Sequence, residues 1–266
     1  MTAKSGKPSR FVTILGVRFY DGEPQGIVDL VSESGGLLVA PAAPALKSIP
    51  YDRGYREALH GADYVIADSA FMVLLWNLVS RPRISKLSGL KYLRLLIEQA
   101  HFRGVGDSFW VMPSRKSAVW NLRWLGENGV RVTDEHTYVA PWYGTTISDA
   151  ALIEMIQARK PRHVVLCIGG GNQERLGLYL KRNLDYRPAI HCIGAAIAFL
   201  SGDQVSIPVW VDALSLGWLW RCISSPRQNI QRYWEARQLA PLMFRYRERS
   251  PQIVDERTIS DVSASS

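Results

Sequence analysis

Short runs of apolar residues alternate along the chain with segments whose apolar residues recur at helical spacing. Seven of the runs have the length of strands. They lie at residues 11–17, 36–39, 63–67, 108–112, 130–133, 163–169 and 189–194. Strands that alternate with helices predict an α/β fold, a Rossmann-like parallel sheet covered by helices on both faces. The run Val164-Val165-Leu166-Cys167-Ile168 has no polar position, so we expect this strand at the centre of the sheet.

Three segments between the runs predict helices. Residues 89–103 follow Ser88, a residue type that caps helix N-termini. Residues 117–128 repeat the helical pattern before Gly129, and a third helix is opened by Thr146 with Asp149. The three apolar faces consist of Leu93, Leu96, Ile97 and Ala100; Val119, Leu122 and Leu125; and Leu152, Met155 and Ile156.

The composition fits a globular protein. The 266 residues are 47% hydrophobic and 21% charged, which argues against collagen-like and disordered chains. No apolar run reaches the roughly 18 residues of a membrane span, because Asp212 interrupts the most apolar stretch. The basic segment 1–10 is followed by a short apolar run without a cleavage site. We therefore expect an unexported, cytoplasmic protein.

Cysteine and histidine give no sign of a metal site. Cys167, Cys192 and Cys222 lack the spacing of metal ligands, and an odd count leaves no complete set of disulfides. We expect Cys167 and Cys192 to be buried, inert thiols, because both lie in predicted strands. The five histidines are scattered, with no pair at helical spacing. The sequence thus predicts no structural metal.

The residues just after the predicted strands are the first candidates for chemistry, because ligands of open α/β sheets bind beyond the carboxyl ends of the strands. The run Gly169-Gly170-Gly171-Asn172-Gln173-Glu174 stands where a strand turns into a helix, so free backbone amides could face a phosphate. The alternative is a tight turn that simply requires glycine. Asp68 also follows a strand, and its position alone favours a helix N-cap over catalysis.

The chain changes character after an α/β domain at residues 1–204. From residue 221 to 249 seven arginines face two acids, a balance of 7 − 2 = +5, and seven aromatic residues accompany them from Trp210 onward. Residues 205–249 therefore predict a basic helical appendage at an anionic membrane surface. A helix packed on the core with a solvated arginine face is the alternative. Nucleic acid is not the expected partner, since no recognised binding motif is present. Residues 250–266 are polar and predict a mobile tail.

Three segments give the chain a resemblance to a known family. The first is 194–202, Gly-Ala-Ala-Ile-Ala-Phe-Leu-Ser-Gly, followed by Leu-Gly-Trp-Leu-Trp-Arg at 216–221. The second is Cys-Ile-Gly-Gly-Gly-Asn-Gln-Glu at 167–174, and the third runs from 56 to 68 and ends in Ala-Asp. In their order along the chain, the three segments resemble the bacterial WecG/TagA/CpsF glycosyltransferases (glycosyltransferase family 26) over roughly residues 36–233.

The resemblance implies an inverting, metal-independent transfer of a sugar from a UDP-sugar to a polyprenyl-pyrophosphate-linked saccharide in cell-envelope or exopolysaccharide synthesis. It implies no cofactor, and it places the enzyme at the inner face of the plasma membrane. Asp68 would be the general base, and Gln173 would contact sugar hydroxyls. The other implied substrate-binding residues are Ser88, Gly89, Gly169, Gly170, Gly171, Asn172, Glu174, Gly194, Arg221, Arg227 and Arg232.

Several positions depart from the family pattern. Ala40 and Ala42 stand where the family usually has a threonine and an asparagine, and Ala198 replaces an acid. The alternative function is therefore a catalytically inert relative that binds a nucleotide-sugar or a lipid-linked intermediate. The Trp-rich C-terminal stretch could also form the interface of a homo-oligomer instead of a membrane face.

Overall fold

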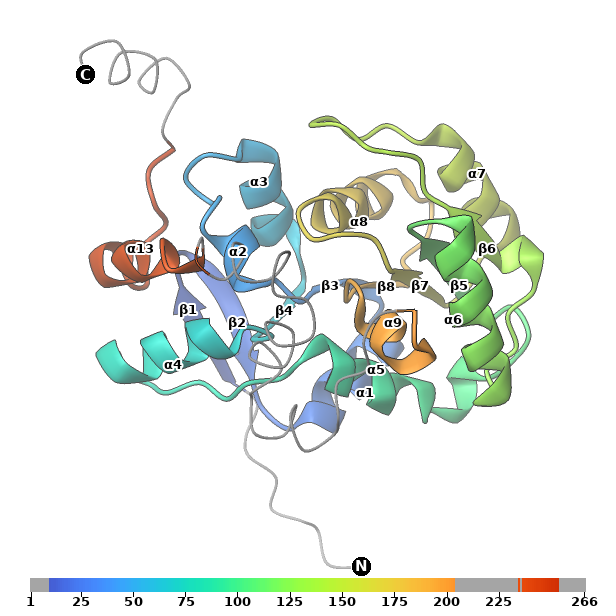
Figure 1. Cartoon of the computed structure of the whole chain (residues 1–266), viewed down its shortest axis with the longest axis horizontal. Coiled ribbons are helices and arrows are strands. Elements are labelled where there is room, and N and C mark those ends of the chain that lie inside the picture. The colour runs from blue at the N-terminus through green and yellow to red at the C-terminus, as the bar shows by residue number, and fades with distance from the viewer. Residues whose placement is uncertain (1–9, 204–233, 235, 254–266) are drawn as a thin grey trace, which may run out of the picture.

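The computed structural model describes residues 10–203, 234 and 236–253, and within them eight strands form one sheet (Figure 1). The order across the sheet is β1-β2-β4-β3-β8-β7-β5-β6. Only β1 and β2 pair antiparallel among these strands, and the other neighbours pair parallel. The strands are β1 (Arg10–Ile14), β2 (Val17–Asp21), β3 (Gly36–Val39), β4 (Tyr64–Ile66), β5 (Ser108–Met112), β6 (Thr137–Val139), β7 (His163–Leu166) and β8 (Ala189–Cys192).

Helices cover both faces of the sheet, as the alternating pattern predicted. The helices are α1 (Pro24–Ser34), α2 (Ala43–Leu46), α3 (Arg53–Gly61), α4 (Ala70–Val79), α5 (Gly89–Ile97), α6 (Arg115–Glu127), α7 (Ala150–Arg159), α8 (Asn172–Asn183), α9 (Ala196–Ser201) and α13 (Leu239–Tyr246), with short 3-10 turns η1 (Ala100–Phe102) and η2 (Asp134–His136). Helices α3 and α8 pack together on one face, and α1, α5, α6 and α9 pack on the other.

The buried side chains form two cores, one on each face of the sheet. Successive residues of a strand point to opposite faces, so Leu37 and Val39 join one core and Leu38 joins the other. Strand β7 is buried throughout and lies between β8 and β5, which confirms the interior position predicted from its lack of polar residues. The α/β Rossmann-like fold is confirmed.

Of the predicted strands, one is wrong in part and one is wrong. The run at 11–17 is a hairpin, because Leu15 and Gly16 both adopt positive φ and reverse the chain between β1 and β2. A leucine is an unusual residue for this conformation, so the turn carries no obvious signal. The run at 130–133 is not a strand, since the strands that pair with β5 are β7 and, on its other side, β6, which begins at Thr137.

The helix boundaries and faces also differ from the pattern. Helix α5 ends at Ile97, six residues before the predicted end at 103, and η1 follows it. The buried face of α6 is formed by Ala118, Asn121 and Leu125, whereas Val119 is 68% exposed. Polar contacts explain this rotation, because the Asn121 side chain accepts a hydrogen bond from Ser201 of α9 at 2.6 Å.

The described C-terminal residues belong to the body of the molecule. Helix α13 packs against α4 and α2 (Figure 1). Beyond it, the carbonyls of Arg247 and Glu248 accept hydrogen bonds from the amides of Leu15 and Gly16 at 2.7 and 3.0 Å. Ser250 and Pro251, which the sequence assigned to the tail, accept hydrogen bonds from Arg56 on α3. Residues 204–233, most of the predicted appendage, lie outside the described residues.

The sheet also buries titratable side chains. Cys167 and Cys192 are buried free thiols, as predicted, and burial raises the pKa of both. His163 and His191 stack with 3.1 Å between His163 Nδ1 and His191 Nε2, and the Tyr92 hydroxyl lies 3.0 Å from His191 Nδ1. Burial lowers the pKa of His191 to about 3, so its ring is neutral at pH 7. No described helix has the length and apolar character needed to cross a membrane.

Candidate active site

Asp68 lies at the carboxyl end of β4, at the edge of the sheet where parallel α/β folds bind ligands. Its Oδ1 accepts a hydrogen bond from the Gly89 amide at 2.9 Å, so the carboxylate meets the first turn of α5. The positive end of that helix attracts a negative charge. The N-cap of the next helix, α4, is Ser69, whose hydroxyl accepts from the Met72 amide. Asp68 therefore does not cap α4, the helix that follows it, and the N-cap interpretation is wrong.

Ser88 and Gly89 bring α5 against the neighbouring strand ends. Ser88 caps α5, as predicted, by accepting a hydrogen bond from the Lys91 amide. Gly89 packs so closely that an added Cβ would lie 3.3 Å from the Ile193 carbonyl oxygen and 3.8 Å from Cβ of Ala40. The residues after β3, β4 and β8 therefore converge around this glycine.

The glycine-rich turn follows β7 and begins α8. Gly169 and Gly170 are exposed, with open space where a side chain would stand. Gly171 has φ of 91°, a conformation that favours glycine. Its amide is not free for an anion, because it donates to Glu174 Oε2 at 2.6 Å. The open part of the turn is thus its first two glycines.

Gln173 and Glu174 tie this turn to the end of β8. Gln173 is only 3% exposed, and its Oε1 accepts from the Gly194 amide at 2.7 Å. Its Nε2 donates to Glu174 Oε1 at 3.0 Å, so both oxygens of Glu174 already have partners. Burial raises the pKa of Glu174 even though these hydrogen bonds and the nearby Arg175 favour the carboxylate. Both side chains therefore tie the start of α8 to its neighbouring backbone, Gln173 to Gly194 and Glu174 to Gly171.

Arg175 was not singled out from the sequence, yet it joins three segments. One guanidinium nitrogen lies 2.8 Å from Asp52 Oδ2, at the start of α3, and another donates to the Thr145 carbonyl at 3.2 Å. The only sequence signal for this role is a basic residue directly after the Gln-Glu pair. The arginine fixes the first turn of α8 between α3 and the loop after β6.

The loop after β6 borders the glycine turn and is strongly anchored. Tyr143 is buried, and its hydroxyl donates to Asp149 Oδ2 at 2.6 Å, while the Tyr138 hydroxyl donates to the same carboxylate. Asn172 reaches the Tyr143 carbonyl at 3.3 Å. Trp142, one residue away, is 94% exposed. Asp149 also caps α7 without help from Thr146, since it accepts from the Leu152 amide.

Of the departures from the family pattern, Ala40 lies beside Gly89 of the candidate site. Ala40 follows β3 and is buried, and Ala42 precedes α2 without a side-chain cap. Ala198 is buried in α9. The predicted site residues Arg221, Arg227 and Arg232 lie outside the described residues. Within the described part of the chain, no group of three or more metal-ligating side chains comes together.

The glycosyl transferase WecG/TagA/CpsF family model matches residues 12–252. The chain belongs to this family. The match extends beyond the 36–233 of the sequence resemblance to include the hairpin β1–β2 and helix α13. As a WecG/TagA/CpsF glycosyltransferase, it has Asp68, Ser88, Gly89, Gly194 and the turn 169–174 gathered at one edge of its sheet.

Proposed function

We propose that the protein is an inverting, metal-independent glycosyltransferase that moves a sugar from a UDP-sugar to a polyprenyl-pyrophosphate-linked saccharide. The observation that carries the proposal is the Asp68 carboxylate, held by the Gly89 amide at the carboxyl end of β4. The family match supports sugar transfer, and the position of Asp68 supports its role as the general base. The pathway would be the synthesis of a cell-envelope polysaccharide or exopolysaccharide.

In this mechanism Asp68 takes the proton from the acceptor hydroxyl as its oxygen attacks the anomeric carbon. The bond between that carbon and the UDP oxygen breaks on the opposite side, which inverts the configuration. A positioned base of this kind contributes about 10² to 10⁴-fold to the rate. The leaving diphosphate carries negative charge, and the exposed glycines Gly169 and Gly170 at the start of α8 are suited to receive it.

The arginines of the basic segment would complete the charge stabilisation. Arg221, Arg227 and Arg232 would pair with the diphosphate of the donor or of the lipid through charge-assisted hydrogen bonds, in place of a metal ion. The same segment would bind the anionic inner face of the plasma membrane, where the lipid-linked acceptor resides. The proposed reaction requires neither a nucleic acid nor a cofactor.

The test is the substitution Asp68→Asn in the full chain. Transfer from a panel of UDP-sugars to a short-chain lipid-pyrophosphate saccharide is measured, and we expect the rate to fall about 10² to 10⁴-fold. Asp185→Asn is the matched control, since Asp185 pairs with Lys160 on the surface at 3.7 Å. An Asp68→Asn enzyme that works at the parent rate would refute the assignment of the base.

Ala40 favours a second candidate, a catalytically inert relative. Its methyl group borders Gly89 where the family usually offers a polar side chain to a ligand. Such a protein would bind a UDP-sugar or a lipid-linked intermediate and pass it to a partner enzyme. Stabilisation by one UDP-sugar in a thermal-shift titration, together with no transfer to any acceptor, would support it. Detectable transfer by the purified parent protein would exclude it.

A further inference from the structure

Two buried hydrogen-bond donors lack an acceptor where the start of α8 meets the start of α3. They are the hydroxyl of Tyr55 and Nε of Arg175, which have no partner among the residues that the structure describes. Tyr55 is only 1% exposed. Leaving a buried donor without an acceptor costs free energy, and native proteins keep few such donors. This junction is therefore short of acceptors.

The carboxylate oxygens at the junction already accept hydrogen bonds. Asp52 accepts through Oδ1 from the Tyr55 amide at 2.8 Å and through Oδ2 from Arg175 at 2.8 Å. Both oxygens of Glu174 accept hydrogen bonds within the first turn of α8. Burial raises the pKa of Tyr55, and the charges of Glu174 and Asp52 raise it further. The Tyr55 hydroxyl therefore lies near the same charges as the guanidinium of Arg175.

The guanidinium of Arg175 lies beside the glycine turn. A Cβ added at Gly171 would stand 3.7 Å from Nη2 of Arg175, and one added at Gly54 would stand 3.3 Å from its Cδ. The contacts with Asp52 and the Thr145 carbonyl use two of the five N–H donors of this guanidinium. A positive charge with unused donors thus stands next to the two exposed glycines that begin the turn.

We propose that Arg175 binds the β-phosphate of the UDP-sugar donor at the glycine turn. The inference rests on the proposed function, which supplies this donor. A phosphate oxygen beside the turn is the acceptor that the junction lacks, and a planar guanidinium suits phosphate oxygens. Asp52 orients the guanidinium from the side of α3.

The β-phosphate is the assigned contact because charge develops there during transfer. When the bond between the anomeric carbon and the β-phosphate oxygen breaks, its electron pair stays on that oxygen. A guanidinium already in place stabilises this charge without rearranging. Arg175 would therefore act in binding the donor and in the departure of UDP.

The experiment measures the dissociation constants of UDP and UMP for the full chain by isothermal titration calorimetry. The two nucleotides differ only in the β-phosphate. We expect Arg175→Gln to weaken the binding of UDP about tenfold or more and to remove most of the parent's preference for UDP over UMP. Arg175→Lys keeps the charge without the planar fork, so its loss should be smaller.

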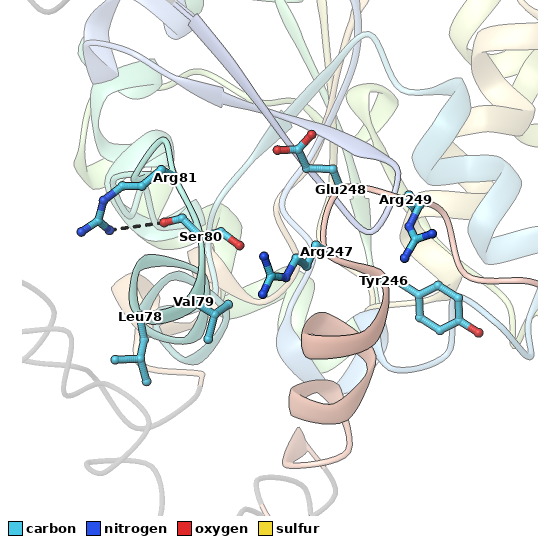
Figure 2. Close-up of a pocket in the computed structure, with 8 residues that line it drawn as sticks. All are labelled: Leu78, Val79, Ser80, Arg81, Tyr246, Arg247, Glu248 and Arg249. Atoms are coloured by element: carbon cyan, nitrogen blue, oxygen red, sulfur yellow. Dashed lines mark hydrogen bonds between the residues drawn. The ribbon is translucent and has the colours of Figure 1, made fainter.

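Two controls separate this contact from packing and from net charge. Arg182→Gln is the matched variant, because Arg182 also joins α8 to α3, through Glu57 Oε1 at 2.7 Å, but lies about two turns further along α8. Arg81→Gln removes a positive charge at the end of α4, where Arg81 donates to the Ser80 carbonyl beside a groove of about 540 Å³ (Figure 2). Both variants should bind UDP and UMP like the parent.

Two results would overturn the proposal alone. The first is an Arg175→Gln chain that is folded by circular dichroism and binds UDP like the parent, which would leave the two donors to buried water. The second is an equal weakening of UDP and UMP, which would mean that the variant only loosens the turn. If Arg175→Gln does not fold, an unchanged preference for UDP in Arg175→Lys overturns the proposal.

The binding test also separates this inference from the proposed function. A parent chain that binds neither nucleotide would overturn the UDP donor and the role of Arg175 together. Nucleotide binding requires no general base, so we expect Asp68→Asn to bind UDP like the parent. An active Asp68→Asn enzyme would refute the assigned base and leave the assignment of Arg175 in place.

Discussion

The anchor of the loop after β6 can be tested by removing one hydrogen bond at a time. The Tyr143 hydroxyl donates to Asp149 Oδ2 at 2.6 Å inside the protein. Tyr143→Phe deletes the donor and keeps the ring. Asp149→Asn keeps the helix cap, because asparagine caps as well as aspartate, but removes the negative charge. The two single variants and the double variant make a thermodynamic cycle.

The structure sets the expected size of each effect. A hydrogen bond to a charged group contributes about 1.5–3 kcal/mol to the free energy of unfolding. Asp149 keeps the Tyr138 hydroxyl and the Leu152 amide when Tyr143 is changed, so its charge is not left unpaired. We therefore expect Tyr143→Phe to cost about 1.5–2 kcal/mol, at the lower end of that range. The coupling between Tyr143 and Asp149 should be about 1–2 kcal/mol.

The assay is urea unfolding followed by far-UV circular dichroism at pH 7. Tyr51→Phe is the control, since Tyr51 is exposed and should change stability by less than about 0.5 kcal/mol. The reasoning fails if Tyr143→Phe is no less stable than this control, or if the double variant loses the sum of the two single losses. Such results would mean that the loop near Asn172 is not held by the buried carboxylate.

Two more predictions follow from close contacts. Gly177→Ala should destabilise the protein by about 1–3 kcal/mol, measured by urea unfolding, because the added Cβ would lie 2.6 Å from Cys192 Sγ and 2.6 Å from Leu37 Cδ1; a more stable variant would contradict this packing of α8. Burial alone would raise the pKa of Asp63, but hydrogen bonds from Lys181 and the Leu37 amide outweigh it and lower the pKa. This stabilisation is present above pH 3.8 and is lost as the pH falls through the lowered pKa, so Asp63→Asn should be less stable than the parent at pH 7 and should approach it near pH 2. Parallel urea curves with the same gap at both pH values would contradict it.

The fold could be predicted because most of its strands occur in the sequence as apolar runs. The runs at 36–39 and 108–112 have the bounds of β3 and β5. The failures occur where tertiary structure overrides local pattern. Strand β6 forms where the chain pairs with β5. The buried face of α6 includes Asn121, which is hydrogen-bonded to Ser201. Neither partner lies in the short stretch of sequence from which the pattern is read.

The candidate site was predictable as a set of positions and not as a set of contacts. Strand ends located Asp68, Gly194 and the turn 169–174 at one edge of the sheet, and the family resemblance added Gly89. The sequence could not show that the Gln173 amide is hydrogen-bonded to Gly194 and Glu174, because these contacts depend on how closely β8 approaches the start of α8. For the same reason Arg175 and the Tyr143–Asp149 pair were missed.

The attachment of Arg247 and Glu248 to the β1–β2 turn has a consequence for synthesis of the chain. The hairpin leaves the ribosome long before residues 247 and 248, so the amides of Leu15 and Gly16 gain these partners only after the strands and helices in between have been synthesised. Contacts between distant parts of a sequence form slowly, because a long loop must close first. The nascent α/β sheet can assemble earlier, whereas the β1–β2 turn is covered only after residues 247 and 248 have been synthesised. A chain truncated before residue 247 would therefore keep the described strands and leave the amides of Leu15 and Gly16 without these backbone partners.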